Sequence, residues 1–159
     1  MVKVTLVLFF SIILNSISLA QYFLPNTLIQ VAELTCDDAN DILVDLGFKF
    51  HGSQTIDNNT AFVWSYGRHG KSETLNSVIT KTCYSDNSIY LYFEFTATNY
   101  YQIFKSYIKK QGYYLKSTSS DNNQMSYDYV SSDSDIYISL ISGFDAIGRN
   151  TYSISIVRF

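Results

Sequence analysis

The residue types that most often carry chemistry in proteins are few in this chain. Its 159 residues include two histidines and two cysteines. No H-E-x-x-H, G-x-S-x-G or G-x-x-x-x-G-K-[ST] motif is present, so hydride, phosphoryl and acyl transfer have no recognisable constellation. We therefore expect a protein that is not an enzyme and needs no cofactor.

One local cluster has the composition of an anion site. Arg68, His69 and Lys71 lie together in "RHGK", and such side chains bind phosphate or carboxylate through charge-assisted hydrogen bonds. A solvated turn explains the cluster equally well, because loops are polar by default. Both interpretations stay open.

The sequence favours no metal site. Four aspartates at 37, 38, 41 and 45 lack the alternating spacing of a calcium loop. Cys36 and Cys83 have no nearby histidines and cannot supply the four ligands of a usual zinc site.

Residues 1–20 have the pattern of a secretory signal peptide. Lys3 precedes a long apolar run, and Ser18-Leu19-Ala20 forms a small-x-small cleavage site before Gln21. The alternative is a transmembrane anchor, but the run is shorter than the roughly 18 residues of a span. We expect a secreted or periplasmic protein with no integral membrane segment after cleavage.

Export would place the two cysteines where disulfides persist. A bond between Cys36 and Cys83 is favoured over two free thiols, because a secreted pair has few other uses. The net charge of −3 argues against nucleic acid as a partner, since nucleic acid attracts clustered Lys and Arg.

Two segments 65 residues apart have the same pattern. Apolar residues recur at helical spacing in 35–46 and in 98–111, and Gly47 and Gly112 follow as helix stops. Thr35 is a candidate N-cap of the first helix. Four strand-like segments follow each helix, at 48–52, 60–67, 77–84 and 88–95, and at 113–117, 125–130, 135–141 and 151–159.

This pattern predicts an α+β domain of two tandem α-β-β-β-β repeats, 35–97 and 98–159. Short connections favour pairing of consecutive strands. Joining the halves edge to edge would give one antiparallel sheet of about eight strands with two helices on one face. We expect residues 21–34 to be an extended lead-in or a short extra strand.

The paired "DLGFKF" and "KQGYYL" junctions and the "VWSY" and "YDYV" strands carry a resemblance at the level of topology. The arrangement over residues 35–159 resembles the β-lactamase inhibitory protein architecture, and also uncharacterised secreted bacterial proteins. The resemblance implies a concave sheet that grips a partner protein. It assigns no inhibitory residues.

Period-two alternation assigns the two faces of the sheet. Asp128 would be costly beneath a helix, so Tyr127 and Tyr129 should point inward. The residues expected inward with them are Phe48, Phe50, Phe62, Trp64, Tyr66, Ile89, Leu91, Phe93, Phe95, Met125, Ile136, Ile138, Leu140, Ile154 and Ile156.

The opposite face is rich in Tyr, Ser and Thr. Tyrosine offers a large contact area at low entropic cost, so we expect a protein partner to be bound there through Tyr84, Tyr90, Tyr92, Tyr114 and Tyr137. These residue types also suit the solvent side of an ordinary antiparallel sheet. A different alternative is a small apolar ligand carrier, with a pocket between helices and sheet lined by core aromatics such as Trp64.

Overall fold

The computed structural model describes residues 24–67, 77–145 and 148–159. The predicted signal peptide lies outside these residues. The fold is α+β, with one antiparallel eight-stranded sheet and three described helices, which confirms the predicted class. None of the helices in the described ranges is long and apolar enough to cross a membrane.

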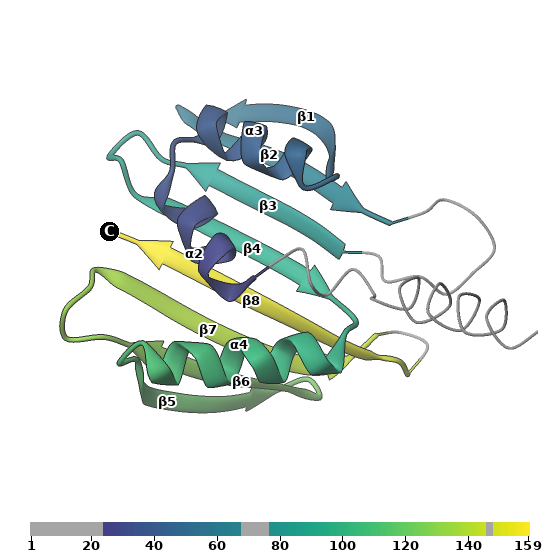
Figure 1. Ribbon diagram of the computed structural model, residues 1–159, viewed down its shortest axis with the longest axis vertical. Helices are drawn as coiled ribbons and strands as arrows, with labels where there is room; N and C mark the ends of the chain where they lie inside the picture. The colour runs from purple at the N-terminus through teal and green to yellow at the C-terminus, as the bar shows by residue number, and fades with distance from the viewer. Residues whose placement is uncertain (1–23, 68–76, 146–147) are drawn as a thin grey trace, which may run out of the picture.

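Each described half has one helix followed by four strands (Figure 1). The first contains α3 (Cys36–Asp45), β1 (Lys49–Ile56), β2 (Asn59–Tyr66), β3 (Ser77–Cys83) and β4 (Ile89–Phe95). The second contains α4 (Thr98–Lys110), β5 (Tyr114–Asp121), β6 (Gln124–Val130), β7 (Ile136–Phe144) and β8 (Asn150–Arg158). The strand order is β1-β2-β3-β4-β8-β7-β6-β5, so the last strands of the halves pair at the centre and the first strands form the edges.

Equivalent features recur at the offset of 65 residues. β1 and β5 begin and end 65 residues apart, and each has a bulge, after Phe50 and after Leu115. Both strands are longer than expected, because residues 53–56 and 118–121, which look like turn segments, pair within the hairpins. The turns themselves are Asp57-Asn58 and Asn122-Asn123, all four with positive φ.

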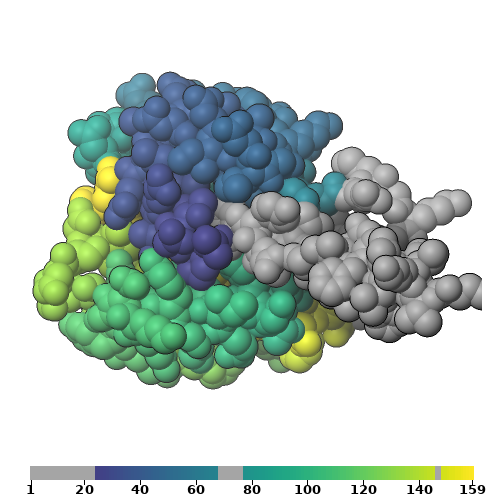
Figure 2. All heavy atoms as spheres, in the orientation of Figure 1, coloured from purple at the N-terminus to yellow at the C-terminus, as the bar shows by residue number. Residues whose placement is uncertain are grey.

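The prediction for residues 21–34 was wrong, because Pro25–Glu33 form a third helix, α2. Pro25 occupies the first turn, where a missing N–H breaks no helical bond. Leu28 and Val31 are completely buried. α2 lies between α3 and α4 over the central strands β4 and β8 (Figures 1 and 2). It covers the part of the sheet that the other two helices leave between them.

The core lies between the helices and the sheet. Trp64 and Tyr129 are 0% and 1% exposed, as alternation predicted, and Trp64 Nε1 donates to Asn40 Oδ1 over 3.0 Å. Phe62, Tyr66 and Tyr127 are partly buried against the core. The other inward residues that are buried as expected are Phe48, Ile89, Leu91, Phe93, Phe95, Ile136, Ile138, Leu140, Ile154 and Ile156.

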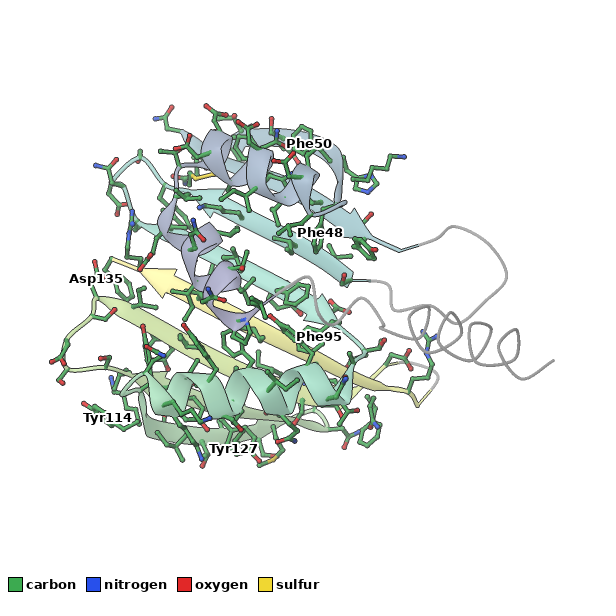
Figure 3. The ribbon with its side chains drawn as sticks, in the orientation of Figure 1. Phe48, Phe50, Phe95, Tyr114, Tyr127 and Asp135 are labelled. Atoms are coloured by element: carbon green, nitrogen blue, oxygen red, sulfur yellow. A yellow bond between two sulfur atoms is a disulfide. The ribbon has the colours of Figure 1, made fainter. Side chains whose placement is uncertain are left out.

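Two residues expected in the core, Phe50 and Met125, are each 40% exposed. Phe50 lies on the edge strand β1, which has no neighbour on its outer side, and appears at the margin of the sheet beside α3 (Figure 3). Its ring still lies 5.6 Å from Trp64 between centroids. Met125 pairs with Ser120 beside the hairpin turn. Burial therefore declines toward the outer hairpins.

The predicted disulfide between Cys36 and Cys83 is present, with the two Cα atoms 6.5 Å apart. Thr35 Oγ1 accepts the Asp38 backbone N–H over 3.2 Å, as expected of an N-cap. The bond attaches the start of α3 to the end of β3.

Candidate functional site: the open face of the sheet

We call the sheet surface opposite the described helices the open face. Its side chains alternate with the buried ones along every strand. Because the helices contribute the buried layer on one side only (Figure 1), the open face presents side chains from all eight strands.

The strand register brings three of the five predicted tyrosines into one line across the sheet, with a valine between neighbours. Tyr90 and Tyr137 both pair with Val157, from opposite sides of β8. Tyr137 also pairs with Val130, which pairs in turn with Tyr114. We call this line the tyrosine row; its members are Tyr114, Val130, Tyr137, Val157 and Tyr90.

The next line across the sheet is polar. It contains Ser117, Asp128, Ser139, Ser155, Tyr92 and Thr80, each paired with the next, and we call it the hydroxyl row. Tyr92, a fourth predicted tyrosine, lies here beside the tyrosine row.

Asp128 is the acceptor at the centre of a hydrogen-bond cluster in the hydroxyl row. Ser139 donates to Oδ1 over 2.6 Å and Ser117 to Oδ2 over 2.7 Å, while Ser126 donates to Oδ1 over 3.3 Å. Burial opposes the charge, but the hydroxyl donors, with Tyr137 among them, outweigh it and lower the pKa of Asp128. The cluster holds a carboxylate whose hydrogen bonds are already satisfied.

Ser153 and Ser155, on the central strand β8, are only 5% and 8% exposed although they lie on the open face. Tyr90 Oη lies 3.3 Å from Ser155 Oγ. Burial raises the pKa of Tyr92, whose hydroxyl donates to Glu94 Oε2 over 3.4 Å.

Beside Ser153 the open face has a cavity of about 180 Å³. Its lining combines carboxylates, an amide, hydroxyls and apolar side chains. The lining residues are Tyr92, Glu94, Gln124, Ile141, Gly143, Phe144, Asp145, Thr151, Tyr152 and Ser153. No pattern in the sequence predicts this cavity, because its residues come from four strands and a loop and are separated by up to 61 positions.

The remaining predicted site residues lie elsewhere. Tyr84, 39% exposed, follows the end of β3 in the turn before β4, so the structure does not bring it into the tyrosine row. Arg68, His69 and Lys71 lie outside the described residues. The anion site stays a prediction.

The ligand pocket predicted between helices and sheet also stays a prediction. Trp64, its proposed lining residue, is fully enclosed and hydrogen-bonded to Asn40, and the cavity described above lies on the opposite side of the sheet. An apolar ligand at Trp64 would have to displace packed core side chains.

One charged residue that the sequence analysis missed is Lys81, which is completely buried on the helix side. Its Nζ donates to the carbonyl oxygens of Val31 and Leu34 over 2.5 Å and of Ala32 over 3.3 Å. Burial lowers the pKa of Lys81 to about 8, with Arg158 acting in the same direction and Asp38 opposing it. Because Cys83 must lie on the helix side to bond with Cys36, alternation along β3 also places residue 81 on that side. The sequence therefore contained a signal for the position of Lys81.

The described side chains form no group of three or more His, Cys, Asp and Glu residues suited to hold a metal ion. Comparisons with known protein families, with curated proteins and with solved structures found no match for this chain. The resemblance to the β-lactamase inhibitory protein architecture accordingly stays a prediction.

Proposed function

We propose that this chain is an exported, noncatalytic binding module that engages a protein partner through the open face. The observation that carries the proposal is the tyrosine row, in which the strand register places Val130 and Val157 between Tyr114, Tyr137 and Tyr90. Aromatic residues with a polar tip are enriched where proteins bind each other, because they bury much surface with few rotatable bonds.

The hydroxyl row supports the same proposal. Its serines can exchange hydrogen bonds with a partner's backbone, since hydroxyl groups both donate and accept. An apolar line beside a polar one supplies the two parts of a typical interface, a ring-bearing centre and a hydrogen-bonding margin.

We also propose that the two halves are tandem repeats of one helix-plus-four-strand unit. The shared bulge position, the shared turn geometry and the equal spacing of β1 and β5 support this. Doubling one such unit would put the helices of both halves on the same face of the sheet and leave the other face without helices. Export is supported by the single disulfide, which persists in oxidising compartments.

The test is a comparison of captured proteins. Purified chain is immobilised and exposed to the secreted proteins of its own source, beside a Tyr90→Ala/Tyr137→Ala variant. We expect a specific species to bind the unmodified chain and to lose at least tenfold in affinity with the variant, since interface tyrosines are frequent hot spots.

The matched control is Ile103→Ala, which truncates an apolar side chain 51% exposed on α4. It should leave capture unchanged. If the unmodified chain and both variants capture the partner equally, or if only Ile103→Ala loses capture, binding through the open face is contradicted.

A further inference from the structure

We infer that the cavity beside Ser153 on the open face receives a lysine or arginine side chain of the protein partner. This inference rests on the proposed function and adds the chemistry of one contact. The cavity opens on the open face beside Tyr92, so a partner lying across the tyrosine row and the hydroxyl row would pass over it.

Small residues create the space. Ser153 and Thr151 form the floor on β8. Gly143, which pairs with Thr151, leaves room for Gln124, because a Cβ atom at 143 would lie 2.7 Å from Gln124 Cγ and 3.3 Å from the Asn123 carbonyl oxygen. The small residues that line the cavity therefore lie on two strands, β7 and β8, and Gly143 has no positive φ.

The charge of the cavity is negative. Asp145 is already paired with Arg149, whose Nε lies 2.8 Å from Asp145 Oδ2. Glu94 has no basic side chain within ion-pair distance among the residues that the structure describes, and its partner there is the Tyr92 hydroxyl at 3.4 Å. Among the described residues, Glu94 is thus an exposed carboxylate with no cation partner beside the opening.

The remaining lining fits the rest of a long basic side chain. Ile141 and Phe144 offer apolar surface for the methylene stem, and Phe144 is 60% exposed at the margin. Lysine and arginine bury such stems while their charged heads keep polar partners. Glu94 and the hydroxyls of Tyr92 and Ser153 supply those partners. An anionic group would be repelled by Glu94, and a wholly apolar one would leave the polar floor unsatisfied.

The experiment is an NMR titration of the intact, disulfide-bonded chain with N-acetyl-arginine amide. N-acetyl-citrulline amide, which has nearly the same shape without the charge, serves as the matched probe. We expect the arginine probe to shift backbone amides of residues 92–94, 141–144 and 151–153 at millimolar concentration, and the citrulline probe to shift them far less.

Glu94→Gln should weaken binding of the arginine probe by about fivefold, the scale of one exposed ion pair. Asp41→Asn is the control, because that exposed carboxylate lies on α3, on the helix side of the sheet; it should leave the affinity unchanged. Equal shifts with both probes, shifts centred elsewhere, or an unaltered affinity in Glu94→Gln would overturn the inference.

This result is separable from the proposed function. If partner capture depends on Tyr90 and Tyr137 but the arginine probe does not bind, the open face is an interface without this contact. If the probe binds at Glu94 but the tyrosine variant captures normally, the cavity exists and the partner surface lies elsewhere.

Discussion

Lys81 Nζ donates to the carbonyl oxygen of Val31, a residue 50 positions earlier in the chain, over 2.5 Å. Lys81 also donates to the carbonyl oxygens of Ala32 and Leu34. Arg158 Nη1 donates to the carbonyl oxygen of Glu33 over 2.9 Å. These bonds satisfy the carbonyl groups at the C-terminus of α2. Two cations from the sheet therefore do what a capping glycine does in many helices.

Replacing Lys81 by methionine should lower the free energy of unfolding by about 1–3 kcal/mol at pH 7, because buried carbonyls would lose their donor. Urea unfolding followed by circular dichroism measures the change. Lys116→Met, at an exposed position on the edge strand β5, should stay within about 0.5 kcal/mol of the unmodified chain. Equal stability of the two variants would show that Lys81 does not hold α2.

Lys81 should also make stability depend on pH in the alkaline range. The pKa of Lys81 is about 8 in the folded protein, below the ordinary lysine value of 10.5 that we take for the unfolded chain. Between these values the unfolded chain binds a proton that the folded protein has released, so the free energy of unfolding rises with pH. Below pH 8 both states are protonated and this dependence vanishes.

The measurement compares the unmodified chain with Lys81→Met between pH 7.5 and 9.5, where the stability difference between them should grow as pH rises. Above pH 10 the titration of Tyr101 lowers the free energy of unfolding, which is opposite to the effect of Lys81. Burial raises the pKa of Tyr101 to about 12 from 10.0, so the unfolded chain loses its proton first and stability falls with pH. A constant difference below pH 9.5 would contradict the assignment to Lys81.

Removing the disulfide should lower the free energy of unfolding by more than Lys81→Met does. The bond closes a loop of 47 residues, and the chain-entropy relation gives about 4 kcal/mol for a loop of that length. We expect the Cys36→Ala/Cys83→Ala variant to unfold at a much lower urea concentration and to match the reduced form of the unmodified chain. If reduction leaves the unfolding midpoint in place, the bond does not stabilise the fold.

Alanine substitutions at the two glycines that follow α3 and α4 test the proposed repeat. Gly47 and Gly112 both have φ of +87°, so alanine should cost about 1–2 kcal/mol at either position. At Gly47 the added Cβ would also lie 3.3 Å from the Tyr66 ring, whereas at Gly112 nothing lies within 4 Å.

Gly47→Ala should therefore be the more destabilising of the two, by up to about 1 kcal/mol. Parallel urea unfolding curves measure both. If only one of the variants loses stability, the two junctions differ in their backbone requirements and the equivalence of the halves is weakened.

Local patterns determined much of this fold. Helical spacing, the Thr35 cap and the glycine stops located α3 and α4, and period-two alternation located the strands and placed Trp64 and Tyr129 inward. These features depend on interactions between residues close in sequence, or on a face pattern that repeats every two positions. The open-face position of Tyr90, Tyr92 and Tyr137 followed from the same alternation.

Tertiary structure alone decided three other features. α2 has neither a side-chain N-cap bond nor a C-terminal glycine, and its nine residues are stabilised by burial and by cations from β3 and β8. Alternation can place residue 81 inward, but only tertiary packing brings it to the end of α2. The exposure of Phe50 depends on β1 being an edge. The cavity beside Glu94 depends on the sizes of side chains that only strand register brings together. In each case the deciding energy comes from contacts between residues far apart in the chain, and sequence spacing carries no record of them.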